Sequence, residues 1–199
     1  MSVKNRVVFA TGNEGKMREI RAILDGLGME VVSMGEAGFT DEIAEDGTTF
    51  EENAAIKARA VWEKTGGIVL ADDSGLEIDA LDGEPGVYSA RYLGDASYEV
   101  KNRTLIGRLD GVPDEKRTAR FVCVIAAVFP DGSLREAKGT MEGIIAREPA
   151  GDGGFGYDPI LYLPEYGVTS AQLSMEEKNK ISHRGKALRR VREMLEANR

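Results

Sequence analysis

Two adjacent carboxylates, Asp72 and Asp73, follow an apolar run at residues 68–70. The run predicts a buried strand, and Ser74 and Gly75 after the acids predict a turn. Burying an unpaired charge is costly, so such a pair normally has a cation or a solvent-filled cleft beside it. Mg²⁺, which takes one or two carboxylates plus substrate phosphates, is one such cation. A solvated turn with two surface acids is the alternative.

A second candidate site lies at residues 11–16, with the sequence Thr-Gly-Asn-Glu-Gly-Lys, between a predicted strand and a predicted helix. The glycines allow the backbone to approach a ligand, the helix start offers free N–H groups, and Lys16 adds a positive charge. This combination suits a phosphate group. The spacing is neither that of the P-loop nor that of the dinucleotide fingerprint, so an ordinary strand-to-helix turn is the alternative.

Acidic and amide side chains mark the start of a second predicted helix. Glu45 and Asp46 precede it, where acids are common as caps. Asn53 and Lys57 are four residues apart and therefore share a face of the helix. Because small and apolar residues indicate that the neighbouring face is packed, this polar pair is typical of side chains that look into a site.

Two later segments carry aromatic and basic groups. Residues 151–159 hold four glycines around two aromatic residues, followed by Asp-Pro, and such a loop can present an aromatic face to a flat ring. Residues 178–186 hold several cations and the single histidine, His183. We expect His183 to form hydrogen bonds rather than act as a general base, because no Ser or Cys nucleophile is indicated for it. A plain glycine loop and a solvated basic helix start are the alternatives.

Composition limits the class of protein. The 199 residues are 42% hydrophobic and 30% charged, as in ordinary soluble globular proteins. The formal charge of −8 argues against a broad nucleic-acid surface, although a local basic pocket for a small anion is compatible with it. The single cysteine, Cys123, lies in an apolar strand and is expected in the core. Without a signal pattern or a membrane-length apolar run, we expect a cytoplasmic protein that does not enter a membrane.

Hydrophobic periodicity predicts a mixture of helices and strands. Helices are expected at about residues 14–27, 48–66, 97–109 and 184–197, the second opened by a capping box of Thr48 and Glu51. Strands are expected at about residues 6–10, 68–72, 76–80, 118–129 and 134–147. Because crossover and hairpin connections both occur, the sheet should be mixed. The predicted class is α/β or α+β, in one domain with ligand loops at strand ends.

Taken together, these segments resemble the inosine triphosphate pyrophosphatase family, whose members hydrolyse non-standard purine nucleoside triphosphates. The matching motifs fall in order along the chain, at residues 11–16, 45–53, 71–76, 85–91, 153–159 and 182–184. One match alone would be weak, whereas the ordered set is highly specific. Tyr157 stands where some relatives have Trp, which keeps an aromatic ring at that position.

The resemblance implies an α/β fold with a long mixed sheet, whose flanking helices form two lobes around a central nucleotide cleft in one domain, residues 1–199. It implies a homodimer that hydrolyses ITP, dITP and XTP to the monophosphate and pyrophosphate with Mg²⁺. By position, Asp73 is implied as the acid that activates water, and Glu45 and Asp73 as metal ligands. Asp72, Asp46 and Glu42 are alternative ligands.

The same resemblance assigns the substrate contacts by position. Residues 11–16 would hold the phosphates, Ser74 would contact the substrate, and the later residues would bind the nucleotide and read the purine. The implied substrate-binding residues are Thr11, Gly12, Asn13, Glu14, Gly15, Lys16, Ser74, Phe155, Gly156, Tyr157, Asp158, Lys178, His183 and Arg184. A hydrogen-bond donor such as Arg184 would bind the 6-oxo group of hypoxanthine and would disfavour the adenine amine, which is itself a donor. Such a mismatch can give ~10⁴-fold discrimination.

Three other functions are compatible with parts of the pattern. The site could prefer modified pyrimidine triphosphates, as in pyrophosphatases of related architecture. A regulator could bind a triphosphate without cleaving it, but a sensor gains nothing from a second carboxylate beside a polyanion. A structural module would leave the glycine–aromatic loop without a reason.

Overall fold

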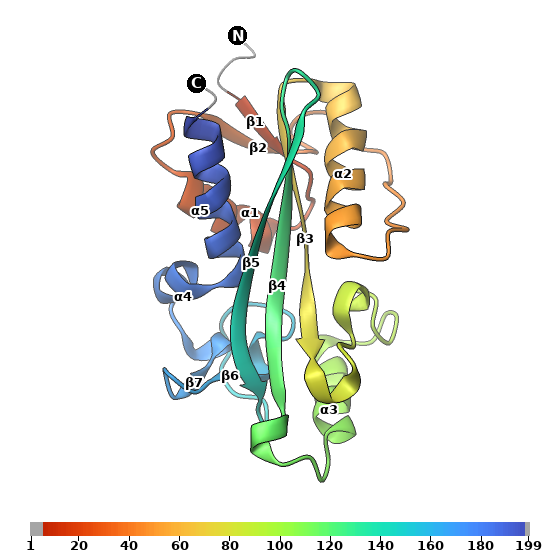
Figure 1. The fold of residues 1–199 in the computed structure, drawn as a ribbon, viewed down its shortest axis with the longest axis vertical. Coiled ribbons are helices and arrows are strands. Elements are labelled where there is room, and N and C mark those ends of the chain that lie inside the picture. Colours follow the sequence, from red (N-terminus) through yellow and green to blue (C-terminus); the bar gives the residue numbers. More distant parts are fainter. Residues whose placement is uncertain (1–5, 198–199) are drawn as a thin grey trace. The chain divides into compact units, whose positions relative to one another are not determined.

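The computed structural model describes residues 6–197. They form a mixed sheet of seven strands in the order β2-β1-β3-β4-β5-β6-β7, with helices packed against it (Figure 1). The strands are β1 (Arg6–Phe9), β2 (Glu30–Ser33), β3 (Ile68–Ile78), β4 (Thr118–Val128), β5 (Leu134–Ile145), β6 (Leu161–Leu163) and β7 (Val168–Thr169). The α-helices are α1 (Glu14–Leu24), α2 (Phe50–Thr65), α3 (Tyr98–Arg108), α4 (Met175–Ile181) and α5 (His183–Glu196).

The chain divides into two compact units. The first unit comprises the residues up to Asp73, Cys123–Gly139 and the residues from Arg184 onward. The second unit comprises Ser74–Val122 and Thr140–His183. The three longest strands, β3, β4 and β5, therefore contribute residues to both units.

The first unit is built on parallel strands. β1 pairs in parallel with β2 on one side and with β3 on the other, so that Val7 lies opposite both Val31 and Ile68. Parallel neighbours need a crossover connection, and α1 and α2 lie in the two segments that join these strands. The alternation of side chains then separates two buried faces.

Helices α1 and α5 cover one face of these strands. Their apolar residues share a core with alternate strand residues, among them Phe9, Leu70 and Cys123. The strand residues between these, such as Val69 and Ala71, are also fully buried. Because successive side chains of a strand alternate, they point to the opposite face of the sheet. In Figure 1, α2 lies on the other side of these strands from α1 and α5. As expected, Cys123 is a core residue.

The second unit has a core of its own, formed by β3, β4, β5, α3 and the segment that leads into β6. Beside it lies Arg117, whose guanidinium is 1% exposed and has main-chain carbonyls as its hydrogen-bond partners. Its Nε donates to Ile145 O at 2.9 Å, and its two terminal nitrogens donate to Leu109 O at 2.9 Å and Ala146 O at 3.1 Å. This arginine ties the end of α3 to the end of β5.

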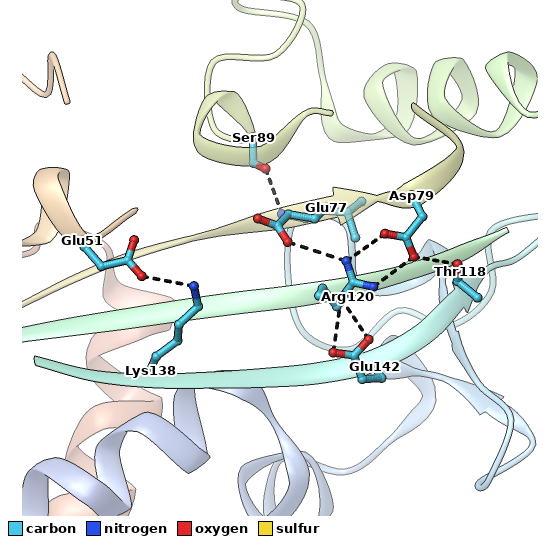
Figure 2. A network of polar contacts seen from close by, with 9 residues as sticks. Glu51, Glu77, Asp79, Ser89, Thr118, Arg120, Lys138 and Glu142 are labelled. Carbon is cyan, nitrogen blue, oxygen red and sulfur yellow. Dashed lines mark hydrogen bonds and ion pairs between the residues drawn. The ribbon is translucent and has the colours of Figure 1, made fainter. Parts of the chain in front are cut away.

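The outward-facing residues of β3, β4 and β5 in the second unit carry an ion-pair network (Figure 2). Arg120 on β4 pairs with Asp79 at 2.9 Å, with Glu142 at 3.0 Å and, more distantly, with Glu77 at 3.7 Å. One guanidinium thus joins acids that follow or lie on the two neighbouring strands. Because the carboxylates outnumber the cation, this face of the sheet stays acidic.

Several expectations for local structure are confirmed and others are wrong. The mixed sheet, the first helices and the β4–β5 hairpin, whose turn is closed by Phe129 N to Ser133 O at 2.9 Å, are confirmed. The first helix ends at Leu24 rather than Leu27, since the chain there turns through Gly26 with φ +81°. The short strands β2, β6 and β7 and the helix α4 were not expected. No helix within residues 6–197 combines the length and apolarity needed to cross a membrane.

The predicted cap of the second helix is wrong by one residue. Thr49, not Thr48, is the N-cap: its backbone is extended, and its side chain accepts a hydrogen bond from Glu52 N. The Glu52 carboxylate in turn accepts from Thr48 N at 2.6 Å. Two consecutive threonines followed by two consecutive glutamates allow either frame, and the backbone decides between them.

Replacing Arg117 by Met should lower the free energy of unfolding by about 3 kcal/mol, because buried carbonyls lose their donors. The matched control is Arg147→Met, which removes a guanidinium that is 60% exposed and pairs with Asp114. That change should cost less than about 1 kcal/mol. Urea denaturation of both variants measures the difference. Equal losses would show that Arg117 is not a structural anchor.

Candidate active site

The two adjacent carboxylates lie inside a continuous strand, not in a turn. β3 runs through Ser74 and Gly75 to Ile78, so the expected break between residues 72 and 76 is wrong. The pairing of β3 with β1 ends at Leu70, but β4 remains its neighbour in the sheet order. On the other side Leu76 N donates to Ser89 Oγ and Ile78 N donates to Glu84 O, so the backbone beyond Asp73 stays extended with its polar groups paired. Successive side chains of a strand point to opposite faces, so Asp72 and Asp73 enter different environments.

Asp72 points toward α1 and α5 and is 1% exposed. One of its oxygens lies 3.0 Å from Lys16 Nζ and 3.3 Å from a terminal nitrogen of Arg184. The other terminal nitrogen of Arg184 pairs with Glu19 on α1. The buried Arg184, the partly buried Lys16 and two buried acids therefore form one network in the first unit. Because each charged group has a partner of opposite charge, the cost of burying these charges is reduced.

This network fixes the charge of Asp72. Burial alone would raise the pKa of the carboxyl group, but Lys16, Arg184 and Lys57 together outweigh burial and lower the pKa well below its usual range. At the neighbouring Cys123 the same cations, Arg184 and Lys16, do not outweigh burial. Its pKa is raised to about 12, chiefly by desolvation, so the thiol stays protonated.

Asp73 points to the opposite face, toward α2. Its carboxylate lies 3.8 Å from Lys57 Nζ and accepts a hydrogen bond from the Asn53 side chain. Lys57 Nζ also lies 2.8 Å from Glu45. Asn53 Oδ1 accepts from Gly47 N at 2.9 Å, which holds the segment that carries Glu45 against α2. The predicted pairing of Asn53 and Lys57 on one helix face is thus part of the site.

The environment of Asp73 shifts its pKa in the other direction. Burial raises the pKa of this carboxyl group, and the attraction of Lys57, Lys16 and the Asn53 hydrogen bond only partly offsets it. At Lys57 the charged neighbours win instead of burial. Burial alone would lower the pKa of Lys57, but Asp72, Asp73 and Glu45 outweigh burial and raise it. One strand therefore carries a carboxyl group whose pKa is lowered next to one whose pKa is raised.

Glu45 and Asp73 are a donor set that fits Mg²⁺. That ion is usually held by one or two carboxylates together with substrate phosphates, and here two carboxylates face the same ammonium group of Lys57. Within residues 6–197, no group of three or more acidic, His or Cys side chains is arranged to hold a metal by itself. Of the alternative ligands, Asp72 is paired with Lys16 and Arg184, and Asp46 and Glu42 are exposed.

The segment at residues 11–16 forms the start of α1, as expected. Asn13 is the N-cap, and its Oδ1 accepts from Lys16 N at 3.0 Å, while Thr11 Oγ1 accepts from Asn13 N at 3.1 Å. Gly12 and Glu14 are exposed. The segment is therefore an ordered helix start whose lysine reaches the buried Asp72, and it brings a positive charge and helix N–H groups to the same place.

In the second unit, Asp158 organises the glycine–aromatic loop. It is 2% exposed and accepts from Phe155 N at 2.8 Å, Ser170 Oγ at 2.7 Å and Lys178 Nζ at 2.8 Å. The Lys178 ammonium also lies 5.1 Å from the centre of the Phe155 ring. A Cβ on Gly154, whose φ is +70°, would lie 2.1 Å from Asp158 Oδ2. Only glycine can therefore occupy that position without displacing the carboxylate.

Of the remaining predicted residues of the second unit, Phe155 is exposed and the others are partly or fully buried. Tyr157 is 5% exposed, and its ring meets Tyr98 edge to face at 5.2 Å. His183 stacks on Phe121 with ring centroids 5.0 Å apart. Ser74 is half-buried on β3. Phe155 keeps 38% of its surface exposed, so the loop presents one open aromatic ring.

The structure groups the predicted residues into three clusters. Lys16 and Arg184 meet at Asp72, Glu45 joins Asp73 through Lys57, and Lys178 joins the aromatic loop through Asp158. Sequence reasoning missed Glu19, the second partner of Arg184. Its signal was available, because it lies between Met17 and Ile20 on the buried side of α1, where an acid requires a partner.

The fold and the site define an α/β protein whose mixed sheet carries a pair of carboxylates beside cations and near helix starts, an arrangement that suits a phosphorylated ligand. Within this class, the chain belongs to the Ham1 family, whose model matches residues 7–194.

Named relatives are similar over nearly the whole chain. The chain is 54% identical over 192 residues to a dITP/XTP pyrophosphatase of Desulforamulus reducens, covering 96% of this chain and 95% of that protein. It is 47% identical over 198 residues to the dITP/XTP pyrophosphatase of Bacillus subtilis, covering 99% and 100%. The structure of the Staphylococcus aureus Ham1 protein matches with a TM-score of 0.88 at 42% identity, covering 98% of this chain and 100% of that one.

The two aspartates should respond oppositely to loss of charge. Asp72→Asn should lower the free energy of unfolding by about 3 kcal/mol, because it leaves the buried Arg184 and the partly buried Lys16 with less compensation. Asp73→Asn should leave it unchanged or raise it, because ionisation of Asp73 opposes folding when its folded pKa is raised. Denaturation at pH 7 with EDTA, which removes divalent cations, measures both.

The pH dependence of the free energy of unfolding is a second test of the lowered pKa of Asp72. The stabilisation from Asp72 is fully present above the pKa of an unfolded aspartate, about 3.9, and is lost as the pH falls below it. The stability difference between the wild type and Asp72→Asn should therefore narrow below about pH 4. A difference that is constant from pH 7 to pH 3 would contradict the lowered pKa of Asp72.

Proposed function

We propose that this protein is a nucleoside triphosphate pyrophosphatase that hydrolyses dITP, ITP and XTP to the monophosphate and pyrophosphate, removing non-standard purine nucleotides from the nucleotide pool. The printed activity of the relatives that are 54% and 47% identical supports this proposal. The observation that carries it is Asp73, a partly buried carboxylate with a raised pKa, held by Lys57 and Asn53 next to Glu45.

Asp73 has the properties of the base that activates water. A base is most effective when its pKa lies closer to the working pH, and burial moves the pKa of Asp73 in that direction. In the proposed step, Asp73 takes a proton from water as the water oxygen attacks the α-phosphorus. The bond from that phosphorus to the α,β-bridging oxygen breaks, and pyrophosphate leaves.

The cations of the first unit lower the electrostatic barrier to this attack. A triphosphate repels an incoming oxygen, and Lys16 and Lys57 are both close enough to the aspartates to act on the same phosphates. The helix start at residues 11–16 adds N–H groups and the positive end of its dipole. Asp72 then has a holding role, because it keeps Lys16 in place without competing for the proton.

We propose Mg²⁺ as the cofactor, with Glu45 and Asp73 as its ligands. Mg²⁺ bound there would neutralise charge on the triphosphate and on the leaving pyrophosphate. Lys57, which bridges the two carboxylates, holds them in one place. The chain's own contribution is thus a preformed pair of carboxylates with a cation between them.

For the base, we propose the glycine–aromatic loop with Lys178 and His183. Phe155 offers an exposed ring for stacking, and Asp158 and Lys178 fix the loop on which it sits. The purine-reading role of Arg184 stays a prediction of the resemblance. In this structure its terminal nitrogens are bonded to Asp72 and Glu19, so reading a 6-oxo group would require it to share those donors.

Other parts of the sequence resemblance also stay predictions: one two-lobed domain over the whole chain, Ser74 as a substrate contact, a homodimer, and a cytoplasmic location without nucleic-acid partners. The triphosphate sensor remains the rival from another class. A sensor would bind ITP without turnover, so kinetics separate the two.

Product analysis tests the proposed reaction directly. Purified protein with Mg²⁺ is incubated separately with ITP, XTP, GTP, ATP and dTTP, and the phosphate products are identified. We expect pyrophosphate with IMP or XMP, and little turnover of GTP, ATP or dTTP. Orthophosphate with a diphosphate would show that a different bond is cut. Tight ITP binding without any turnover would favour the sensor.

Asp73→Asn should reduce turnover of ITP by at least 10²-fold while nucleotide binding is largely retained, because the variant lacks the general base. The matched control is Asp131→Asn, in the exposed β4–β5 turn, which should keep full activity. Steady-state kinetics and equilibrium ITP binding measure the two effects. Retention of more than a small fraction of activity in Asp73→Asn would remove this residue from the catalytic role.

A further inference from the structure

One sequence motif has no role in the proposed reaction: residues 85–91, with the sequence Pro-Gly-Val-Tyr-Ser-Ala-Arg. In the second unit this segment contacts the glycine–aromatic loop. The Tyr157 hydroxyl donates a 2.6 Å hydrogen bond to the main-chain oxygen of Ser89, and both residues are buried. The motif therefore touches the loop at the residue two positions after Phe155.

Ser89 is itself fixed in place. Its hydroxyl accepts a hydrogen bond from Leu76 N of β3 at 2.9 Å, as Figure 2 shows, and donates to Gly86 O at 2.6 Å. Ser89 N also bonds to Gly86 O at 3.0 Å. The carbonyl that receives the Tyr157 hydroxyl thus belongs to a tight turn anchored to the sheet.

Two consecutive residues of α3 hold the same two segments. Lys101 Nζ donates to Ala90 O at 2.9 Å, in the motif, and Asn102 Nδ2 donates to Gly156 O at 3.1 Å, in the loop. Both side chains are at least 96% buried. The backbone is therefore held on both sides of the Phe155 side chain, by the hydrogen bond from Phe155 N to Asp158 and by the hydrogen bond that Gly156 O accepts from Asn102.

Asn102 is costly for a purely structural residue. It is 3% exposed, and within the described part of the chain its Oδ1 accepts no hydrogen bond, although the atom is buried. A buried acceptor without a donor destabilises the folded state. An apolar side chain of similar size would avoid this cost, so the useful feature of Asn102 is its NH₂ group, which holds Gly156.

We propose that Asn102 and the Tyr157 hydroxyl are positioning groups that fix the aromatic loop so that Phe155 meets the nucleobase without reorganisation. The inference rests on the proposed function, in which Phe155 stacks on the base. Each group acts through the loop and does not touch the substrate. Holding the loop in its binding conformation lowers the entropic cost of binding, and this benefit appears in substrate affinity rather than in the chemical step.

The test uses Asn102→Leu and Tyr157→Phe, each of which removes the hydrogen bond and keeps most of the side-chain volume. Tyr166→Phe is the matched control, because Tyr166 is 49% exposed in the same unit. Phe155→Ala reports on base stacking itself. Hydrogen exchange of peptides that cover residues 153–158, Tm, and KM and kcat for ITP are measured for each variant.

We expect both positioning variants to speed hydrogen exchange in residues 153–158 and to raise KM about 3- to 10-fold, the effect of one hydrogen bond, with kcat within about twofold. Asn102→Leu should keep Tm within about 3 °C of the wild type, since removing the unpaired oxygen offsets the lost bond. Tyr166→Phe should change none of these quantities. A purely structural role would lower Tm without this division between KM and kcat.

Unchanged hydrogen exchange, or faster exchange with an unchanged KM, would overturn the positioning role. If Phe155→Ala raises KM while Asn102→Leu and Tyr157→Phe do not, base stacking survives and only the positioning proposal fails. If the wild type does not hydrolyse ITP, or Phe155→Ala leaves its KM unchanged, the proposed function or its base site fails first. The positioning role for a base then falls with it.

Discussion

A β-strand sends successive side chains to opposite faces, and in this protein that alternation separates two adjacent carboxylates. Asp72 enters a buried network with Lys16, Arg184 and Glu19, which keeps it ionised. Asp73, one residue later, faces α2, where burial outweighs its partners and raises its pKa. Neighbouring residues of the same type thereby acquire different chemistry: one holds a cation, and the other is suited to take up a proton. The helices α1, α2 and α5 supply the partners on which this difference depends.

The distribution of charge explains how an acidic protein can serve an anionic substrate. The formal charge is −8, yet the proposed phosphate site contains cations, each of which is held in place by a pairing with one or more carboxylates. Each such pair fixes a lysine at a place where it can also contact a phosphate. The fold is less stable for it where the acid, like Asp73, opposes folding when it is ionised. In the second unit, Asp158 holds Lys178 near the Phe155 ring in a similar way. Both units thus use buried acids to place cations.

Much of this arrangement was predictable from residue types, and the exceptions have physical reasons. Periodicity located α1, α2 and the β4–β5 hairpin, and the acid pair and the glycine–aromatic loop were recognisable by composition. The turn at Ser74 and Gly75 was predicted wrongly, because local propensity does not register the sheet neighbours that keep β3 extended. The partners of Arg184 and Asn102 lie 165 and 54 residues away in the sequence, so pattern alone could not pair them. Short strands such as β7 have too few residues to show a period.

The register of β3 has a consequence for how the chain can vary. Inserting or deleting a single residue between Ile68 and Asp72 would turn the following side chains to the other face, so that each aspartate would point to the face that the other occupies now, while the composition stays nearly the same. The stretch between β2 and α2, which carries Glu45, is under no such parity rule, because it is anchored at points such as the bond from Gly47 to Asn53 rather than along a ladder. In this protein, a change of length by one residue is therefore disruptive in a strand, where side chains alternate with a period of two, and better tolerated in a loop that is anchored at single points.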